Sequence, residues 1–223
     1  MESSVEPWLR ATEFLDHDSS QVHGFVRAAI SDKHSTPVDK AVALYYAVRD
    51  GLFYEVYATD MSRVGLQAST IVESGQGFCV QKSILYAACL RAVGIPSKLV
   101  VTEVRNHLAS DRLRRMVGGE VFVHMLNSAY LNGRWVRATP VFNEMLCRLY
   151  GMDSLEFDGV HDSMHHPFDD GNGRSMEFIR EHGEFDDLPY DWLLELMRHK
   201  HPAMFAGAST AGSGSLMDEA NSP

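Results

Sequence analysis

The stretch SGQGFC at residues 74–79 decides the fold, because it places a cysteine between a glycine turn and a helix. Two glycines so close together indicate a tight turn. The next segment, Val80–Val93, carries apolar residues in a helical pattern. Gly94 is typical of a helix C-cap, and Pro96 stops the helix soon after. Cys79 is therefore predicted to open a helix.

This position gives Cys79 a chemical character. Free backbone N–H groups and the positive end of the helix dipole favour the thiolate, which is the nucleophilic form of cysteine. The same N–H groups can stabilise an oxyanion, and the glycines leave room for a substrate. A lone cysteine is more often a small buried hydrophobe, and that plainer interpretation suits Cys89 and Cys147. Cys79 is the candidate nucleophile.

Two helices and an extended segment are predicted upstream. Apolar residues recur at helical spacing over Val22–Ile30. Thr36 can cap a second helix that begins at Pro37 and ends near Gly51. Phe53–Tyr57, rich in aromatic and branched residues, is then typical of an extended segment.

Downstream of the cysteine, a strand over Lys98–Val104 precedes a predicted β-hairpin. The hairpin strands are Glu120–Leu131 and Arg134–Val141, and the Asn132-Gly133 pair between them is the strongest short signal for a hairpin turn. A two-residue turn pairs the residues that flank it, and this fixes the register of the two strands.

In that register His124 lies opposite Val141, with Thr139 and Asn143 as its diagonal neighbours on the same sheet face. Either polar side chain can orient the imidazole through its second nitrogen. Pro140 interrupts the ladder, so the register beyond it is open.

These features together resemble the transglutaminase-like superfamily of papain-type cysteine enzymes, and in particular its bacterial, single-domain members. The resemblance covers roughly residues 36–145. The residues that carry it, besides the segment Lys40 to Tyr54, are Ala68-Ser69-Thr70, Gly75-Gln76-Gly77-Phe78-Cys79, Lys82-Ser83, Leu90 to Ser97, His124, Gly133 to Val136 and Ala138-Thr139-Pro140.

The resemblance implies an α+β fold, in which a Cys-bearing helix packs on an antiparallel β-sheet that carries the histidine. It also implies acyl transfer or amide hydrolysis through a thioester at Cys79, with His124 as the base. The acceptor is water in a protease or amidase and an amine in a transglutaminase. The implied substrate is a protein, a peptide or a small amide, and no cofactor is required.

The chain departs from the family at one position. The family usually has an aspartate before the proline of the second hairpin strand, and Thr139 stands there. A threonine can accept a hydrogen bond from an imidazole but supplies no charge to an imidazolium. The third catalytic residue is therefore open among Thr139, Asn143, which we prefer, and Asp158.

Two other functions compete with this interpretation. The first is a catalytically silent binding or scaffolding module on the same fold, which the missing aspartate favours. The second is a metal protein, since histidines and aspartates gather after residue 158, but glycine and proline there argue against the helix that such a site needs. A solvated loop is the simpler account of that cluster: His161, Asp162, His165, His166, Asp169 and Asp170.

Composition excludes some classes of function. A net charge of -10 disfavours nucleic acid as a partner. No apolar run approaches the ~18 residues of a membrane span, and the acidic N-terminus lacks a secretory signal. Three irregularly spaced cysteines argue against a disulfide framework. We therefore expect a cytoplasmic protein.

The remaining organisation is expected as follows. Residues 1–35 form an N-terminal helical segment, 36–205 the transglutaminase-like domain and 206–223 a disordered tail rich in Gly, Ser and Ala. Leu155–Asn172 is predicted to be a long ordered loop, which can close over a cleft. Ser175–His182 and Tyr190–His199 are predicted helices. The oligomeric state is not readable.

Overall fold

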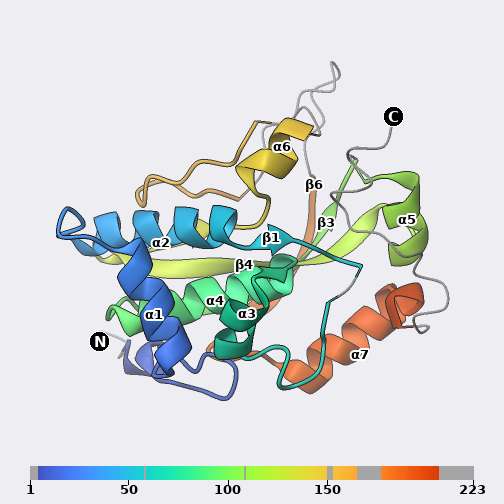
Figure 1. Cartoon of the computed structure of the whole chain (residues 1–223). Helices are drawn as coiled ribbons and strands as arrows, with labels where there is room; N and C mark the ends of the chain where they lie inside the picture. The colour runs from blue at the N-terminus through green and yellow to red at the C-terminus, as the bar shows by residue number, and fades with distance from the viewer. Residues whose placement is uncertain (1–4, 58, 108, 150–152, 165–176, 206–223) are drawn as a thin grey trace.

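The computed structural model describes residues 5–57, 59–107, 109–149, 153–164 and 177–205. Helices gather on one side of a long-stranded sheet, with α2 and α4 crossing in front of β4 (Figure 1). In chain order the elements are η1 (Glu6–Leu9), α1 (Ser20–Ala29), α2 (Pro37–Gly51), β1 (Phe53–Tyr54), α3 (Ala68–Ser74), β2 (Gln76–Gly77), α4 (Cys79–Ala92), β3 (Ser97–Arg105), α5 (Asp111–Val117), β4 (Val121–Leu131), β5 (Arg134–Ala138), α6 (Glu144–Leu149), β6 (Glu177–Phe185), α7 (Tyr190–Lys200) and η2 (Pro202–Phe205).

The main sheet is four-stranded and antiparallel, in the order β5-β4-β3-β6. One face of it packs on α4, whose residues are buried almost all round. Burial on every side explains why the middle of this helix, residues 84–90, is entirely apolar. The predicted α+β architecture, with the Cys-bearing helix against an antiparallel sheet, is confirmed.

The start of α2 follows the predicted capping pattern. Thr36 Oγ1 accepts a hydrogen bond from the N–H of Asp39, and the Asp39 carboxylate accepts one from the N–H of Thr36. This reciprocal pair satisfies two donors that would otherwise be unpaired at the helix start. The buried face of α2 then packs on α4.

The hairpin register is confirmed as far as Ala138. Asn132 and Gly133 take positive φ values of 50° and 82°, as a tight two-residue turn requires. The ladder runs from Leu131–Arg134 to Asn127–Ala138. The second strand is shorter than predicted, since β5 ends at Ala138 and does not reach Val141. Pro140 explains this, because it has no N–H to donate to the ladder.

The predicted helix over Ser175–His182 is wrong. The described part of this segment belongs to β6, which pairs with the free edge of β3. Its sequence contains good helix formers, and pairing along β3 overrides that local preference. The β3–β6 register shifts twice, and Gly183 at φ 146° lies at one of these irregularities. The neighbouring helix prediction is confirmed by α7.

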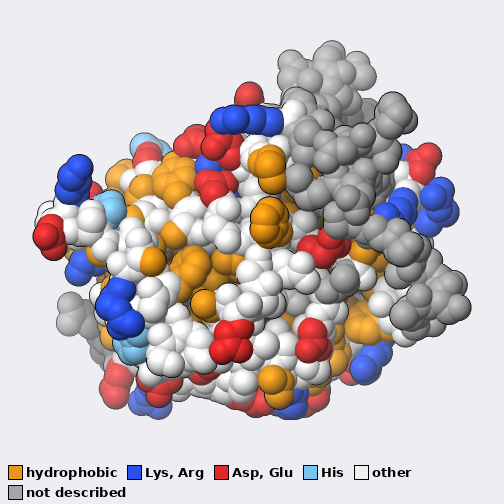
Figure 2. Space-filling view, viewed as in Figure 1, with side chains coloured by type: hydrophobic (Ala, Val, Ile, Leu, Met, Phe, Trp, Pro, Cys, Tyr) orange, Lys and Arg blue, Asp and Glu red, His pale blue; other side chains and the backbone are white. Residues whose placement is uncertain are grey.

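The N-terminal segment contributes to the same core as the rest of the chain, through Phe14, Leu15, Val22 and Val26. None of the helices in the described part of the chain has the length and hydropathy that a bilayer crossing requires. On the face shown in Figure 2, Lys and Arg side chains are scattered among Asp and Glu and form no broad basic area. The predicted tail, residues 206–223, lies outside the described residues.

Candidate active site

The turn before Cys79 is built by β1 and β2, which pair in parallel. Gly75 has φ 63°, a left-handed conformation that glycine adopts without strain. Gly77 serves a different purpose, because a Cβ there would lie 2.5 Å from Cβ of Gln81. Gly77 thus makes room for the Gln81 side chain of α4.

Cys79 is the first residue of α4, and its sulfur lies against β4. Sγ is 4.0 Å from the carbonyl oxygen of Val123. The backbone N–H of Met125 is directed at the same sulfur and acts to lower the pKa of the thiol, as do the N–H groups at the helix start. The sulfur therefore contacts the backbone on both sides of His124.

Burial outweighs these favourable N–H groups. Cys79 is only 5% exposed, and burial raises the pKa of its thiol to about 12. Burial therefore opposes the expected preference for the thiolate, because loss of water costs the anion more than the N–H groups return. A neutral thiol would need a base before it could act as a nucleophile.

His124 lies in the middle of β4 and is 6% exposed. It pairs across the sheet with Thr102, whose hydroxyl donates to the His124 carbonyl oxygen at 3.1 Å. Val123 and Met125, which flank it, contribute to the core around α4. Alternation along the strand places the His124 side chain on the opposite face of β4 from the side chains of Val123 and Met125.

Thr139 follows the last residue of β5 and is 3% exposed. Its carbonyl oxygen accepts a hydrogen bond from the hydroxyl of Tyr45, and its own hydroxyl oxygen has no hydrogen-bond partner among the described residues. The position of the family aspartate is thus occupied by a buried, unpaired hydroxyl.

Asn143 has a structural role in addition to any catalytic one. Its amide nitrogen donates to the carbonyl oxygens of Arg49 at 2.6 Å and Leu52 at 2.5 Å. Its amide oxygen accepts from the N–H of Tyr54 at 2.9 Å. A carbonyl oxygen has two lone pairs, so one remains for an imidazole N–H.

Asp158 lies in an exposed turn. Its carboxylate accepts hydrogen bonds from the N–H groups of Val160 and His161 and contacts the imidazole of His161, and these bonds hold the pKa of Asp158 well below its usual range. No cluster of three potential metal ligands occurs among the described residues. The other four residues of the proposed metal loop, His165, His166, Asp169 and Asp170, lie outside them.

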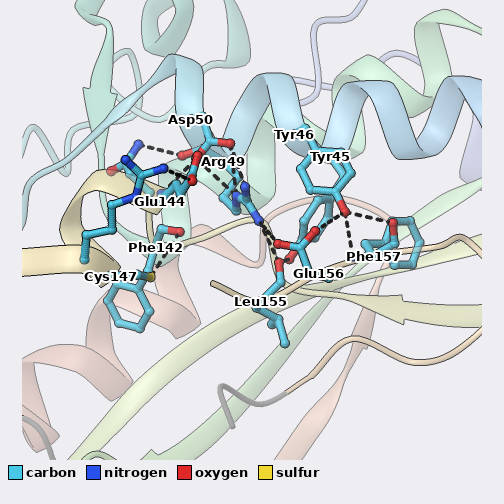
Figure 3. A network of polar contacts seen from close by, with 12 residues as sticks. Tyr45, Tyr46, Arg49, Asp50, Phe142, Glu144, Cys147, Leu155, Glu156 and Phe157 are labelled. Atoms are coloured by element: carbon cyan, nitrogen blue, oxygen red, sulfur yellow. Dashed lines mark hydrogen bonds and ion pairs between the residues drawn. The ribbon is translucent and has the colours of Figure 1, made fainter. Parts of the chain in front are cut away.

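A network at the end of α2 fixes the segment after α6 (Figure 3). Arg49 is 4% exposed, pairs with the carboxylates of Asp50 and Glu156, and donates to the carbonyl oxygen of Leu155. The hydroxyl of Tyr45 joins that same Leu155 oxygen to Thr139. The described half of the predicted 155–172 loop is therefore fastened to α2, while closure by residues 165–172 is outside the described part.

The sequence analysis assigned no role at this site to two residues that contact it, Ser83 and His201. Ser83 lies one helical turn after Cys79 and donates to the carbonyl oxygen of Met125 at 3.0 Å. Its spacing of four residues places it on the same face of the helix, and this signal could have identified it. His201, which binds the N–H of Val123, has no signal in the sequence, because 78 residues separate the pair.

A cysteine at a helix start beside a strand histidine is the arrangement of papain-type cysteine enzymes. The family model of the transglutaminase-like superfamily matches residues 25–140, more than half of the chain, and the protein belongs to that superfamily. No curated protein matches the sequence.

Two solved structures are similar to parts of the chain. One is a candidate cysteine protease from Cytophaga hutchinsonii, at 15% identity and a TM-score of 0.44, over 63% of this chain and 43% of the other. The second is a TGase, at 19% identity and a TM-score of 0.40, over 56% of this chain and 32% of the other. This chain thus spans less than half the length of either protein.

Proposed function

We propose that this protein is a cysteine-dependent acyl-transfer enzyme, which cleaves or exchanges an amide through a thioester at Cys79. One observation carries the proposal: Cys79 Sγ is held against the backbone of β4 immediately before and after His124. Membership of the superfamily supports the same reaction class.

The steps follow from the residues present. His124 accepts the thiol proton of Cys79 as the sulfur attacks the acyl carbon, and the C–N bond breaks as His124 returns the proton to the leaving amine. Water or a second amine then attacks the thioester carbon and loses its proton to His124. The C–S bond breaks, and His124 returns that proton to the released sulfur of Cys79. Because burial holds the pKa of the Cys79 thiol near 12, we expect proton transfer to be concerted with attack on a bound substrate.

The proposed class of substrate rests on the charge of the protein. Acidic and basic side chains are intermixed on the face in Figure 2, and the net charge is -10. This charge disfavours polyanions and fits a protein, a peptide or a small amide. Asn143 is the proposed partner of His124, with Thr139 in a lesser role.

The experiment is site-resolved alkylation of the native protein. Iodoacetamide at neutral pH should modify Cys79 faster than Cys89 and Cys147, which are also buried, are not placed beside His124 by the proposal, and serve as internal controls. His124→Gln should remove that difference. Equal labelling of all three thiols in the wild type would count against the enzyme.

The alternative is a catalytically silent module on the same fold. The unpaired hydroxyl of Thr139 in place of an aspartate and the raised pKa of the Cys79 thiol favour it. An acyl-enzyme trapped on Cys79 by a peptide thioester, and detected by mass spectrometry, distinguishes an enzyme from a silent module. A silent module would show no such adduct under conditions in which the thiol can be alkylated.

A further inference from the structure

The free edge of β4 beside His124 is completed by side chains instead of a strand. β5 ends at Ala138, opposite Asn127, so within the described part of the chain Met125 and Val123 have no strand partner on that side. In an antiparallel sheet the backbone groups of alternate residues point to the same neighbour, and those of Val123 and Met125 point toward the missing strand. Unpaired backbone groups this deep in a protein are costly.

Three side chains contact these four backbone groups, which are the N–H and the carbonyl oxygen of Val123 and of Met125. Ser83 donates to the carbonyl oxygen of Met125 at 3.0 Å. Cys79 contacts the carbonyl oxygen of Val123 and receives the N–H of Met125. The fourth group, the N–H of Val123, donates to Nε2 of His201 at 2.9 Å. Cys79 and His201 therefore contact the carbonyl oxygen and the N–H of one residue, Val123.

His201 is fixed in one neutral tautomer. It is 2% exposed and directly follows α7. Nε2 accepts from Val123, so Nδ1 carries the proton and donates to the carbonyl oxygen of Val117 at 2.8 Å. A second proton on Nε2 would face the N–H of Val123 and break that bond.

We propose that neutral His201 is a positioning residue for the Cys79–His124 pair, because it holds the β4 edge against which the sulfur lies. This inference rests on the proposed function and adds a pH-sensitive control of the same site. Acid conditions should release the edge and misplace the sulfur.

Burial and nearby charges set the pH at which His201 takes up its second proton. Burial lowers the pKa of His201, while the bond to the Val117 carbonyl oxygen acts to raise it and the charge of Lys200 acts to lower it. Glu103, from β3, raises it, but Glu103 is shared with Lys200 and with His182 of β6. A folded-state pKa below the ordinary value of 6.5 means that the unfolded chain takes up this proton first. The stabilising contribution of neutral His201 is therefore present above 6.5 and is lost as the pH falls through the folded-state pKa.

The test measures two quantities across pH 5–8 in the full chain: amide exchange at Val123 by NMR, and the alkylation rate of Cys79. As the His201 ring titrates, the wild type should lose protection at Val123 and the alkylation rate should fall in parallel. His201→Gln, whose amide can accept without titrating, should remove this acid step. His201→Phe should slow alkylation on the order of tenfold at neutral pH, the effect of about one hydrogen bond.

The exposed neighbour His199 provides a matched control, since His199→Gln should leave both curves unchanged. Unchanged protection at Val123 while His201 titrates, or an acid step that persists in His201→Gln, would overturn the inference, and the wild-type curves decide this even if His201→Phe does not fold. Failure of the proposed function would look different. Cys79 would then label no faster than Cys89, whatever residue 201 is.

Discussion

The amide oxygen of Asn143 accepts the N–H of Tyr54 at 2.9 Å, and its amide nitrogen binds two carbonyl oxygens at the end of α2. This one side chain therefore joins β1 to α2, close to the segment that leads into Cys79. Any role of Asn143 beside His124 is added to this structural task, so its mutants must be assessed for stability and reactivity separately.

Asn143→Ala should lower both the stability of the fold and the reactivity of Cys79. It leaves three backbone groups without this partner, at a cost of about 1–3 kcal/mol for each group that water cannot reach. It should also slow alkylation of Cys79, if the amide orients His124. Thermal unfolding and alkylation at a temperature where the variant is fully folded separate the two effects. A destabilised variant with normal alkylation would confine Asn143 to its structural role.

Thr139 provides the complementary test. Thr139→Val keeps the shape and removes a hydroxyl that has no hydrogen-bond partner among the described residues, so stability should change little or improve. Alkylation of Cys79 should also change little. Thr139→Asp restores the carboxylate typical of the family and should speed alkylation by favouring an imidazolium. Loss of reactivity in Thr139→Val would reverse our preference between Thr139 and Asn143.

Cys79→Ala should abolish thioester formation and leave the fold intact, because it removes a single sulfur atom at the first residue of α4. Cys89→Ala is the matched control: it is fully buried within the same helix and should cost stability only. Mass spectrometry after incubation with a peptide thioester, together with thermal unfolding, checks both. An adduct on the Cys79→Ala variant would place the chemistry elsewhere.

The cysteine helix and the hairpin could be predicted because their signals are local. Gly94 and Pro96 end the helix, and Asn132-Gly133 sets a register that holds to Ala138. β6 could not be predicted in this way. Its residues have no strong local preference for a strand, and its conformation comes from pairing with β3, far earlier in the chain.

In the candidate site too, local features could be predicted from the sequence and long-range ones could not. Cys79 and His124 are recognisable from the turn and the strand that carry them. The raised pKa of the Cys79 thiol is not, because it depends on how completely β4 and α4 exclude water. The bond between His201 and Val123 depends on where α7 ends, and no sequence pattern records that contact.

Arg49 should hold the segment Leu155–Phe157 in place. Arg49→Met removes the ion pairs to Asp50 and Glu156 and the bond to the Leu155 carbonyl oxygen. Both carboxylates retain access to water, so we expect a loss of about 1–3 kcal/mol and no larger penalty for a stranded charge. Limited proteolysis should then cut near residues 153–163 more readily. An unchanged cleavage rate would show that Tyr45 and Tyr46 suffice to hold the segment.

The last prediction concerns Lys82, a buried lysine three residues after Cys79. Its ammonium group is fully buried and donates to the carbonyl oxygen of Arg49 at 2.7 Å. Burial lowers the pKa of Lys82 to about 7, although Asp50 acts to raise it. In the unfolded chain the value returns to the ordinary 10.5. Between these two values the unfolded state holds more protons, so the contribution of Lys82 to the free energy of unfolding rises with pH.

Lys82→Met should remove this dependence while it preserves most of the side-chain volume. The free energy of unfolding of the wild type minus that of the variant should increase from about pH 7 toward 10, by on the order of a few kcal/mol, since one pKa unit is worth ~1.4 kcal/mol. Below pH 7 both states are protonated, so the difference should level off. Urea unfolding at several pH values measures the curve, and Lys40→Met, on α2, shows the effect of deleting a lysine charge elsewhere in the chain. A flat difference for Lys82→Met would mean that Lys82 keeps its proton in the folded state across this range.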